Sequence, residues 1–417
     1  MEKAVATDFG NRAGPAHLGK KALRIAYVTE TYPPEVNGVA NTAVRFVEGL
    51  RARGHAIQLV RPRQDRGDHA HNTTGYREIL MPGMPIPRYP DLRMGLPSTG
   101  ELQRLWNTER PHLVHIVTEG PLGWSALRAA LKLKLPVSSD FRTNFHAYSR
   151  HYGIGWLQKP IAAYLRGFHN RTGLTLVPTE AMRADLTRRG FRNLRVVARG
   201  VDTQLFDPTR RSLTLRAHWG AGPDDPVVLH VGRLAPEKNL EPVITAFEQA
   251  RTVHSRAKLV FVGDGPARDS LRARCPDAVF AGTRIGVDLA EHYASGDVFL
   301  FSSLTETFGN VTVEALASGL AVVAYDYAAA REHIVHGHNG MLARYDDSAE
   351  FARHAISLLQ NPARRREIGQ RAHLGAETLA WTNVVEEFET MLQAVAESPP
   401  APAGLSIAGL FPGAAQS

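Results

Sequence analysis

Two glutamates eight positions apart, Glu306 and Glu314, occupy the segment ETFGNVTVEALASG (306–319). The segment follows an apolar strand-like run, and its polar loop predicts a helix that begins near residue 310. Free N–H groups at such a helix start point out of the carboxyl edge of a parallel sheet, where α/β proteins bind ligands. A glutamate in the first turns of a helix ordinarily compensates the helix dipole. The spacing of these two glutamates instead favours one that lies beside a bound sugar and one that accepts ribose hydroxyls. The N–H groups expected to receive phosphate or sugar oxygens belong to Thr307, Phe308, Gly309, Asn310 and Val311.

Two cations five positions apart, Arg233 and Lys238, follow another strand-like run in the segment VGRLAPEKN (231–239), next to Gly232. A nucleoside diphosphate gains negative charge as it leaves a sugar, and Arg plus Lys in a water-poor site stabilise that charge as a metal would. The sequence has no Asp-x-Asp pair, the usual carboxylate arrangement for holding a metal against a diphosphate. We therefore expect no metal and no cofactor, with the nucleoside diphosphate sugar as a substrate.

The elements that must position these residues alternate between apolar runs and amphipathic stretches, which is typical of α/β proteins with parallel sheets. Strands at 23–30 and 55–62 flank a helix at 41–54, and another helix is expected at 124–134. Two similar series in succession imply a cleft between two halves. Further strands are expected at 112–119, 136–142, 173–180, 225–234, 258–265, 278–284, 297–303 and 320–327.

The two series predict two domains joined by a linker near 202–225, where Asp-Pro and Gly-Pro turn signals cluster. Tails rich in small and polar residues are expected to be flexible. The division in chain order is a tail over 1–22, a Rossmann-like domain over 23–215, a second over 216–377, a final helix over 378–396 and a tail over 397–417.

Charge is distributed unevenly along the 417 residues. Residues 1–217 carry 33 lysines and arginines against 17 acidic residues, and the remainder carries 16 against 24. A basic half can bind nucleic acid, an acidic substrate or an anionic membrane surface, although an arginine-rich genome has the same effect. Nucleic acid is not expected, because no recognised binding module or stacking-aromatic motif accompanies the charge.

The chain has no run of 18 uncharged apolar residues and no apolar stretch of a signal peptide at its N-terminus. Its single cysteine, Cys275, cannot form an internal disulfide, which agrees with a reducing compartment. A cytoplasmic location follows as the expectation.

The segments ETYPPEVNGVANT (30–42), VGRLAPEKN and ETFGNVTVEALASG together resemble retaining glycosyltransferase family 4, whose GT-B fold has two Rossmann-like domains facing across a cleft. The similarity runs from roughly Arg24 to Gly319. It implies that the first domain binds the acceptor and the second the donor. By this resemblance Arg233 and Lys238 hold the donor diphosphate, Glu314 binds the ribose, and Glu306 lies near the transferred sugar.

The resemblance also assigns residues outside the two glutamate and cation segments. It implies that backbone around Gly38 approaches the phosphates, which suits a residue without a side chain. Gly263 in VGDG (262–265), together with Arg284 and Ile285, lines the base pocket in such proteins. The segment WTNVVEEFETMLQAV (381–395) resembles the family's final helix, which crosses back onto the first domain.

One segment departs from the family pattern. Related enzymes often read SYHTN where this chain has DFRTNFH (140–146), so Arg142 replaces a histidine that contacts the transferred sugar. Either Arg142 takes that role with a permanent charge, or His146 does, or the site is inactive or takes another donor.

The resemblance predicts front-face displacement, in which the acceptor hydroxyl attacks on the leaving-group side and the departing phosphate takes its proton. The ETYPPE opening and the TNF segment favour GDP-mannose as donor, as in GDP-mannose-dependent α-mannosyltransferases, with a UDP-sugar as the alternative. The acceptor is expected to be a lipid or glycan. A nucleotide-sugar epimerase or hydrolase and a non-catalytic nucleotide or polyanion binder are the alternatives from other classes.

The basic half suggests peripheral association with the inner face of an anionic membrane. Trp124, Trp156 and the proline-rich segment 81–97 are the side chains and loop expected to reach the lipid, although that segment also reads as a plain connection.

Overall fold

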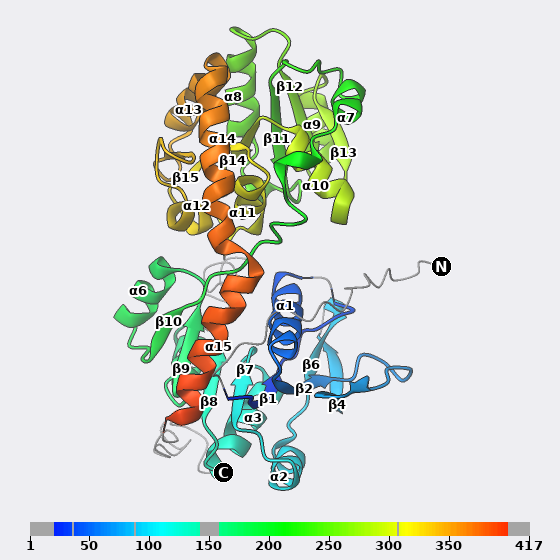
Figure 1. Cartoon of the computed structure of the whole chain (residues 1–417), viewed down its shortest axis with the longest axis vertical. Coiled ribbons are helices and arrows are strands. Elements are labelled where there is room, and N and C mark those ends of the chain that lie inside the picture. Colours follow the sequence, from blue (N-terminus) through cyan, green and yellow to red (C-terminus); the bar gives the residue numbers. More distant parts are fainter. Residues whose placement is uncertain (1–20, 36, 87–88, 142–157, 307, 399–417) are drawn as a thin grey trace, which may run out of the picture. The chain divides into compact units, whose positions relative to one another are not determined.

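The computed structural model describes residues 21–398 except 36, 87–88, 142–157 and 307 (Figure 1). Backbone contacts divide the chain into two compact units. The first holds the described residues of Met1–Ser139, Arg171–Gly173 and Glu389–Ser406, and the second holds those of Asp140–Asn170, Leu174–Phe388 and Ile407–Ser417. The domain boundaries expected at 215 and 377 stay predictions.

An eight-stranded sheet has the order β10-β9-β8-β7-β1-β2-β4-β3, and its strand β1 (Arg24–Val28) pairs in parallel with both neighbours. Four of the five residues of β1 are buried, which explains why this strand reads as an uninterrupted apolar run. The other strands are β2 (Ala56–Pro62), β3 (Asn72–Thr73), β4 (Tyr76–Met81), β7 (Leu113–Ile116), β8 (Val137–Asp140), β9 (Leu174–Val177) and β10 (Leu194–Val196).

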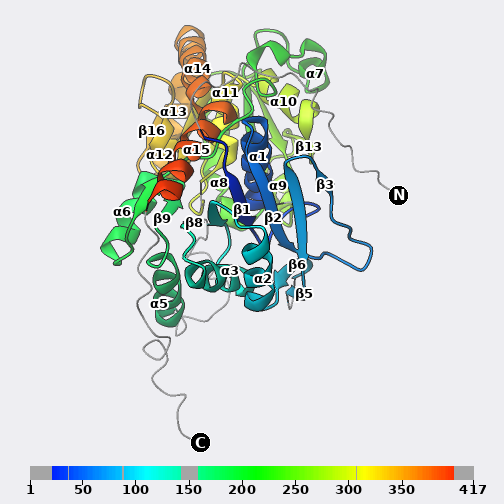
Figure 2. The same cartoon turned by 60° about the horizontal axis from the view of Figure 1, so that its bottom comes forward.

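The helices along this part of the chain begin earlier than the sequence predicted. Helix α1 (Gly38–Ala52) begins three residues before the expected 41, because the Asn37 side chain accepts hydrogen bonds from the N–H groups of Val39 and Ala40. Helix α3 (Pro121–Lys132) likewise begins with a proline, which suits a first turn, and it lies beside α2 (Thr99–Thr108) (Figure 2). Two further helices are α5 (Gln158–His169) and α6 (Glu180–Arg188).

Segment 81–97 is not a plain connection. It forms the antiparallel pair β5 (Gly83–Ile86) and β6 (Tyr89–Gly95). The expected linker near 202–225 also contains structure, namely η2 (Pro208–Arg210) and the short helix α7 (Leu213–His218).

A second, all-parallel sheet has the order β13-β12-β11-β14-β15-β16. Strand β11, in the middle of this sheet, is buried on both faces. Val227 and Leu229 pack in one apolar cluster, and Val228 packs in the other. Helices α10 (Gly286–Ser295), α11 (Asn310–Ala317) and α14 (Pro362–Ala376) contribute to the first cluster, and α8 (Glu241–Arg251) and α13 (Ser348–Gln360) contribute to the second. The strands are β11 (Val227–Val231), β12 (Lys258–Val262), β13 (Val279–Gly282), β14 (Val298–Phe301), β15 (Ala321–Tyr325) and β16 (Met341–Ala343).

The six-stranded sheet of the second unit thus lies between two helical layers, as expected for a doubly wound fold. Its helical elements are η3 (Pro236–Lys238), α8 (Glu241–Arg251), α9 (Arg268–Arg274), α10 (Gly286–Ser295), α11 (Asn310–Ala317), α12 (Ala328–His333), α13 (Ser348–Gln360), α14 (Pro362–Ala376) and η4 (Glu377–Leu379).

The last helix, α15 (Trp381–Glu397), ends in the first unit. There Glu389 pairs with Arg53 and His55, each at 2.8 Å, and His55 Nδ1 accepts the N–H of Leu23 at 3.0 Å. These buried polar contacts join α15 to the residues around β1 and β2.

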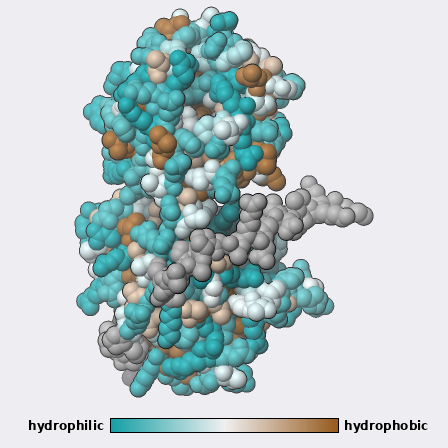
Figure 3. All heavy atoms as spheres, in the orientation of Figure 1, coloured by the Kyte–Doolittle hydropathy of each residue, from teal (hydrophilic) through white to brown (hydrophobic). Residues whose placement is uncertain are grey.

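The visible surface in Figure 3 is mainly hydrophilic, with separate apolar spots. Within residues 21–398, as far as they are described, no helix combines the length and the apolar character that crossing a bilayer requires. Cys275 is buried in the second apolar cluster, so it serves as a small core residue.

Candidate functional site

The predicted cation and glutamate segments follow two adjacent parallel strands. Strands β11 and β14 pair directly, with Val228 opposite Val298. The carboxyl ends of neighbouring parallel strands meet at the same edge of a sheet, so the loops that leave Val231 and Phe301 lie side by side. We call residues 302–306 the Glu306 loop and residues 232–239 the Lys238 loop.

Lys238 and Glu306 form an ion pair between these two loops. Lys238 Nζ lies 2.5 Å from Glu306 Oε1, and the side chains are only 20% and 14% exposed. Two hydrogen bonds fix the same junction: Asn239 Nδ2 donates to the Ser302 carbonyl at 3.2 Å, and Ser302 Oγ donates to the Asn239 carbonyl at 2.5 Å. The structure therefore joins two segments that the sequence presents separately.

Arg233 does not join this pair. Its guanidinium lies 3.5 Å from the Glu237 carboxylate on its own loop, and its side chain is 66% exposed. Arg233 and Lys238 thus have separate acidic partners, and their joint binding of a diphosphate stays a prediction. Exposed ion pairs contribute little to stability, so this guanidinium remains accessible to an anion.

Gly263, which follows strand β12, can approach the Lys238 loop closely because it has no side chain. Gly263 has φ +133°, and a Cβ there would lie 1.9 Å from the Gly232 carbonyl oxygen. The Gly232 N–H donates to the Val262 carbonyl, and the Gly263 N–H donates to the Gly282 carbonyl, both at 2.9 Å. The two predicted glycines hold neighbouring strand ends together, while their contact with a ligand stays a prediction.

Helix α11 begins at Asn310, where the sequence placed it. Its N-cap is Gly309, which adopts the left-handed conformation at φ +96° and offers no side chain for capping. Phe308 is buried, and its carbonyl accepts the Ala329 N–H at 2.7 Å. The main-chain donors of Asn310 and Val311 thus begin a helix without a side-chain cap, which is a favourable place for an anion.

Glu314 lies one turn inside α11 and is partly buried. Tyr293 Oη, from the buried face of α10, donates to Glu314 Oε2 at 2.8 Å. Burial raises the pKa of Glu314 to about 7, and it raises that of Tyr293 well above its ordinary value. Additional hydrogen-bond donors would favour the ionised form of this group, and its contact with ribose hydroxyls stays a prediction.

The predicted base-pocket residues Arg284 and Ile285 directly precede helix α10. Arg284 Nε donates to the Ala281 carbonyl at 2.9 Å, and its Nη1 lies 3.1 Å from Asp288. Ile285 is the N-cap residue of this helix and is 79% exposed. Such an exposed apolar side chain offers contact area to a flat base.

Four other predicted residues do not join this group in the described structure. Gly38 is the first residue of α1, in the first unit. Arg142 and His146, the two candidates for the missing histidine, lie outside the described residues, as does Thr307.

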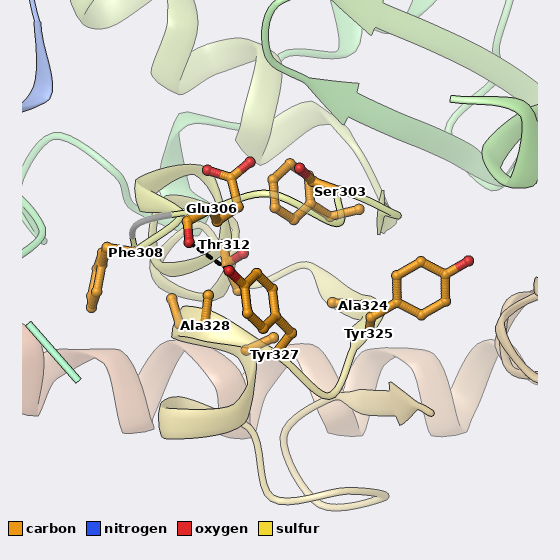
Figure 4. Close-up of a pocket in the computed structure, with 11 residues that line it drawn as sticks. Ser303, Glu306, Phe308, Thr312, Ala324, Tyr325, Tyr327 and Ala328 are labelled. Atoms are coloured by element: carbon orange, nitrogen blue, oxygen red, sulfur yellow. Dashed lines mark hydrogen bonds between the residues drawn. The ribbon is translucent and has the colours of Figure 1, made fainter. Parts of the chain in front are cut away.

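A small pocket lies behind the Glu306 loop, between α11 and α12 (Figure 4). Tyr327 forms part of its wall and donates from Oη to the main-chain carbonyl of Glu306 at 2.9 Å. The Glu306 carboxylate extends away from Tyr327 in this view. Ser303 and Phe308 also line this pocket.

Sequence reasoning missed Tyr293, Tyr327 and Arg199. Arg199 Nη1 lies 3.4 Å from the Asn310 side-chain oxygen, and its guanidinium carbon lies 6.0 Å from the Phe308 ring. The tyrosines read as ordinary core aromatics, because no local spacing connects them to the glutamates.

Comparison with known proteins matches residues 36–205 to the family described as Glycosyltransferase Family 4 and residues 225–361 to Glycosyl transferases group 1. Over 379 residues the chain is 35% identical to a GDP-mannose-dependent alpha-mannosyltransferase of Mycobacterium tuberculosis, covering 89% of this chain and 97% of the relative. It is 31% identical over 371 residues to the sulfoquinovosyl transferase SQD2 of Arabidopsis thaliana, covering 87% of this chain and 71% of the relative. Sucrose-phosphate synthase from Thermosynechococcus elongatus superimposes with a TM-score of 0.70 at 18% identity, over 89% of this chain and 98% of that one.

Proposed function

The chain belongs to glycosyltransferase family 4 as a retaining hexosyltransferase of GT-B fold, and from that premise we propose that it transfers mannose from GDP-mannose to a lipid or glycan acceptor without a metal ion. The observation that carries the site is the Lys238–Glu306 pair beside the uncapped start of α11. The mannose and the guanosine base are supported by the 35% identity to a mannosyltransferase over most of both chains.

Positive charge supports the leaving group in this mechanism. Lys238 and Arg233, with the N–H groups at the start of α11, face the charge that develops on the diphosphate. Glu306 holds Lys238 in place before the donor binds, and the donor phosphate then shares the ammonium group. No metal is required for this charge balance.

The reaction exchanges two bonds on one face of the sugar. The bond from the anomeric carbon to the phosphate oxygen breaks, and a bond to the acceptor oxygen forms on the same side. The acceptor proton passes to the departing phosphate oxygen. A product with inverted anomeric configuration, measured by NMR, would contradict this mechanism.

Nucleotide selectivity tests the donor. Thermal unfolding is measured with GDP, UDP and ADP in EDTA, since a ligand at 100 times its Kd adds about 2.7 kcal/mol to the free energy of unfolding. Selective stabilisation by GDP supports the proposal, and selective stabilisation by UDP assigns the UDP-sugar alternative. No shift with any of the three contradicts donor binding and favours a non-catalytic role.

Acceptor dependence separates the proposed transferase from an epimerase or hydrolase on the same fold. GDP release from GDP-mannose is measured with and without a membrane-lipid extract. We expect the extract to increase release and to become labelled with mannose. Release that is unaffected by the extract favours the hydrolase, and isomerised nucleotide sugar without release favours the epimerase.

A lipid acceptor also accounts for the basic half, through peripheral association with the anionic inner face of a membrane. In the first unit, Met84 of the β5–β6 pair is 40% exposed, whereas Trp124 is partly buried with Arg171 at 5.7 Å from its ring. The hairpin is therefore the better candidate contact, and Trp156 lies outside the described residues. Sedimentation with anionic and with zwitterionic vesicles tests this, and equal binding to both contradicts electrostatic attraction.

A further inference from the structure

The Glu306 loop is held from two sides. On one side the Lys238 loop contacts it through the Lys238–Glu306 pair, and Thr305 Oγ1 donates to the Glu237 carbonyl at 3.3 Å. On the other side two tyrosines contact its main chain. They come from further along the sequence, where the chain leaves β15 and β16.

The two tyrosines donate to carbonyls two residues apart. Tyr327 Oη lies 2.9 Å from the Glu306 carbonyl oxygen, and Tyr345 Oη lies 2.9 Å from the Leu304 carbonyl oxygen. The rings contact each other edge to face, with centroids 5.4 Å apart. Burial raises the pKa of Tyr327, so its hydroxyl remains a donor at every physiological pH.

Tyr327 and Lys238 fix opposite ends of one residue. The Glu306 carbonyl accepts from Tyr327, while its carboxylate pairs with Lys238 and extends away from the tyrosine (Figure 4). A fixed carbonyl sets the peptide plane, and a fixed carboxylate sets the side-chain torsions. Catalytic geometry is sensitive to such placement, because a 1 Å displacement costs about 10²-fold in rate.

We propose that Tyr327 is a positioning residue, whose hydroxyl holds the main chain of Glu306 so that the carboxylate lies beside the transferred sugar. The inference rests on the proposed role of Glu306. Tyr345 holds the same loop by a hydrogen bond to Leu304 and not to Glu306, and 52% of this residue is exposed. It provides a matched control: the same chemical deletion in the same loop.

The test compares Tyr327→Phe with Tyr345→Phe in the full chain. GDP release from GDP-mannose is measured with a membrane-lipid extract as the acceptor, together with the Kd for GDP and the Tm. We expect Tyr327→Phe to lower kcat by about tenfold to 10²-fold, with the KM for GDP-mannose and the Kd for GDP within twofold of the wild type. Tyr345→Phe is expected to keep kcat within twofold, with a similar change in Tm.

Equal kcat values for the two variants overturn the inference, because they show only a common structural role. A Tyr327→Phe effect confined to KM overturns it as well. Glu306→Gln separates this failure from failure of the proposed function. If Glu306→Gln keeps wild-type turnover, the assignment of Glu306 is wrong; if it loses turnover while Tyr327→Phe does not, only the positioning role fails.

Discussion

Two helix starts, α1 in the first unit and α11 in the second, each follow a strand of a parallel sheet but differ in how their N–H groups are used. At α1 the Asn37 side chain already accepts two of the first N–H groups. At α11 the N-cap is a glycine without a side chain. The helix that lacks its own cap is the one next to Lys238 and Glu306, where an anion has most to gain.

The same contrast extends to the glutamates. In the first unit Glu30 is buried, accepts the Leu122 N–H at 2.7 Å and thereby caps α3, while Glu35 accepts the hydroxyl of Thr31 at 2.6 Å. In the second unit Glu306 pairs with a partly exposed lysine, and Glu314 receives a single tyrosine hydroxyl. The two glutamates of the first unit therefore stabilise local backbone or hydroxyl groups, whereas Glu306 and Glu314 contact side chains of other elements and are the ones we propose for ligand binding.

Removing the Lys238 ammonium is expected to have the largest effect. Lys238→Met deletes charge from the leaving-group site and leaves Glu306 unpaired, so kcat should fall by about 10²- to 10³-fold in the GDP-release assay. Arg256→Met is the control, since Arg256 is an 80% exposed cation paired with Asp225 in the same unit. A kcat of Lys238→Met within threefold of the wild type would show that the Lys238 loop is not part of the active site.

A comparison of Gly263→Ala with Gly54→Ala distinguishes a steric clash at the Lys238 loop from the backbone strain of an alanine at positive φ. The new Cβ would lie 1.9 Å from the Gly232 carbonyl, so we expect a loss of about 3 kcal/mol in the free energy of unfolding and weaker GDP binding by about tenfold. Gly54→Ala, at φ +88° with open space around it, should cost about 1 kcal/mol and leave GDP binding intact. Denaturant unfolding measures the stability of both variants, and calorimetry measures their GDP affinity. Equal effects of the two substitutions would show that backbone strain, and not the clash with Gly232, causes the losses.

Protonation of Glu314 should make nucleotide binding depend on pH. Its pKa is raised from 4.5 to about 7, so the carboxylate that we propose accepts ribose hydroxyls is lost as the pH falls below 7. GDP affinity should therefore rise by about tenfold from pH 6 to pH 8, with proton release on binding. Because the folded chain holds this proton more tightly than the unfolded chain, the same group lowers stability as the pH rises from 4.5 through 7.

Glu314→Gln is the matched control for that profile, since both proteins share the titration of GDP itself. The GDP affinity of the variant should rise less between pH 6 and pH 8, because the ionisation of Glu314 no longer contributes. Identical profiles for the two proteins would show that Glu314 does not touch the nucleotide.

Asn37→Ala should have the smallest effect on ligand binding. It removes the α1 cap and is expected to lower the free energy of unfolding by about 1 kcal/mol, with GDP affinity within twofold of the wild type. A tenfold loss of GDP affinity would instead show that the asparagine cap is needed to position the backbone around Gly38, which the family resemblance places near the phosphates.

Sequence patterns predict the fold well for strands that are buried on both faces. Strand β14 is a continuous apolar run, and β11 is one apart from the buried His230, because both faces of these strands are covered. Gly309 before Asn310 marks the start of α11. The start of α1 was placed too late, because an asparagine cap lies upstream of the first apolar residues.

The details of the site were less predictable. Tyr293 lies 21 positions from Glu314 and Tyr327 lies 21 positions from Glu306, and sheet packing alone brings these residues together. Arg233 and Lys238 were expected to act as a pair, but each has its own acidic partner, Glu237 and Glu306. Local spacing identifies cations at a strand end, whereas their partners depend on which loop lies next to them.

Calorimetric titration of GDP-mannose in EDTA and then in Mg²⁺, on the wild type and on Lys238→Met, tests the central claim most directly. We predict equal Kd values for the wild type in the two buffers and at least tenfold weaker binding by Lys238→Met in both. Binding that appears only with Mg²⁺, or that Lys238→Met leaves unchanged, would contradict a donor diphosphate held by the cations of the second unit.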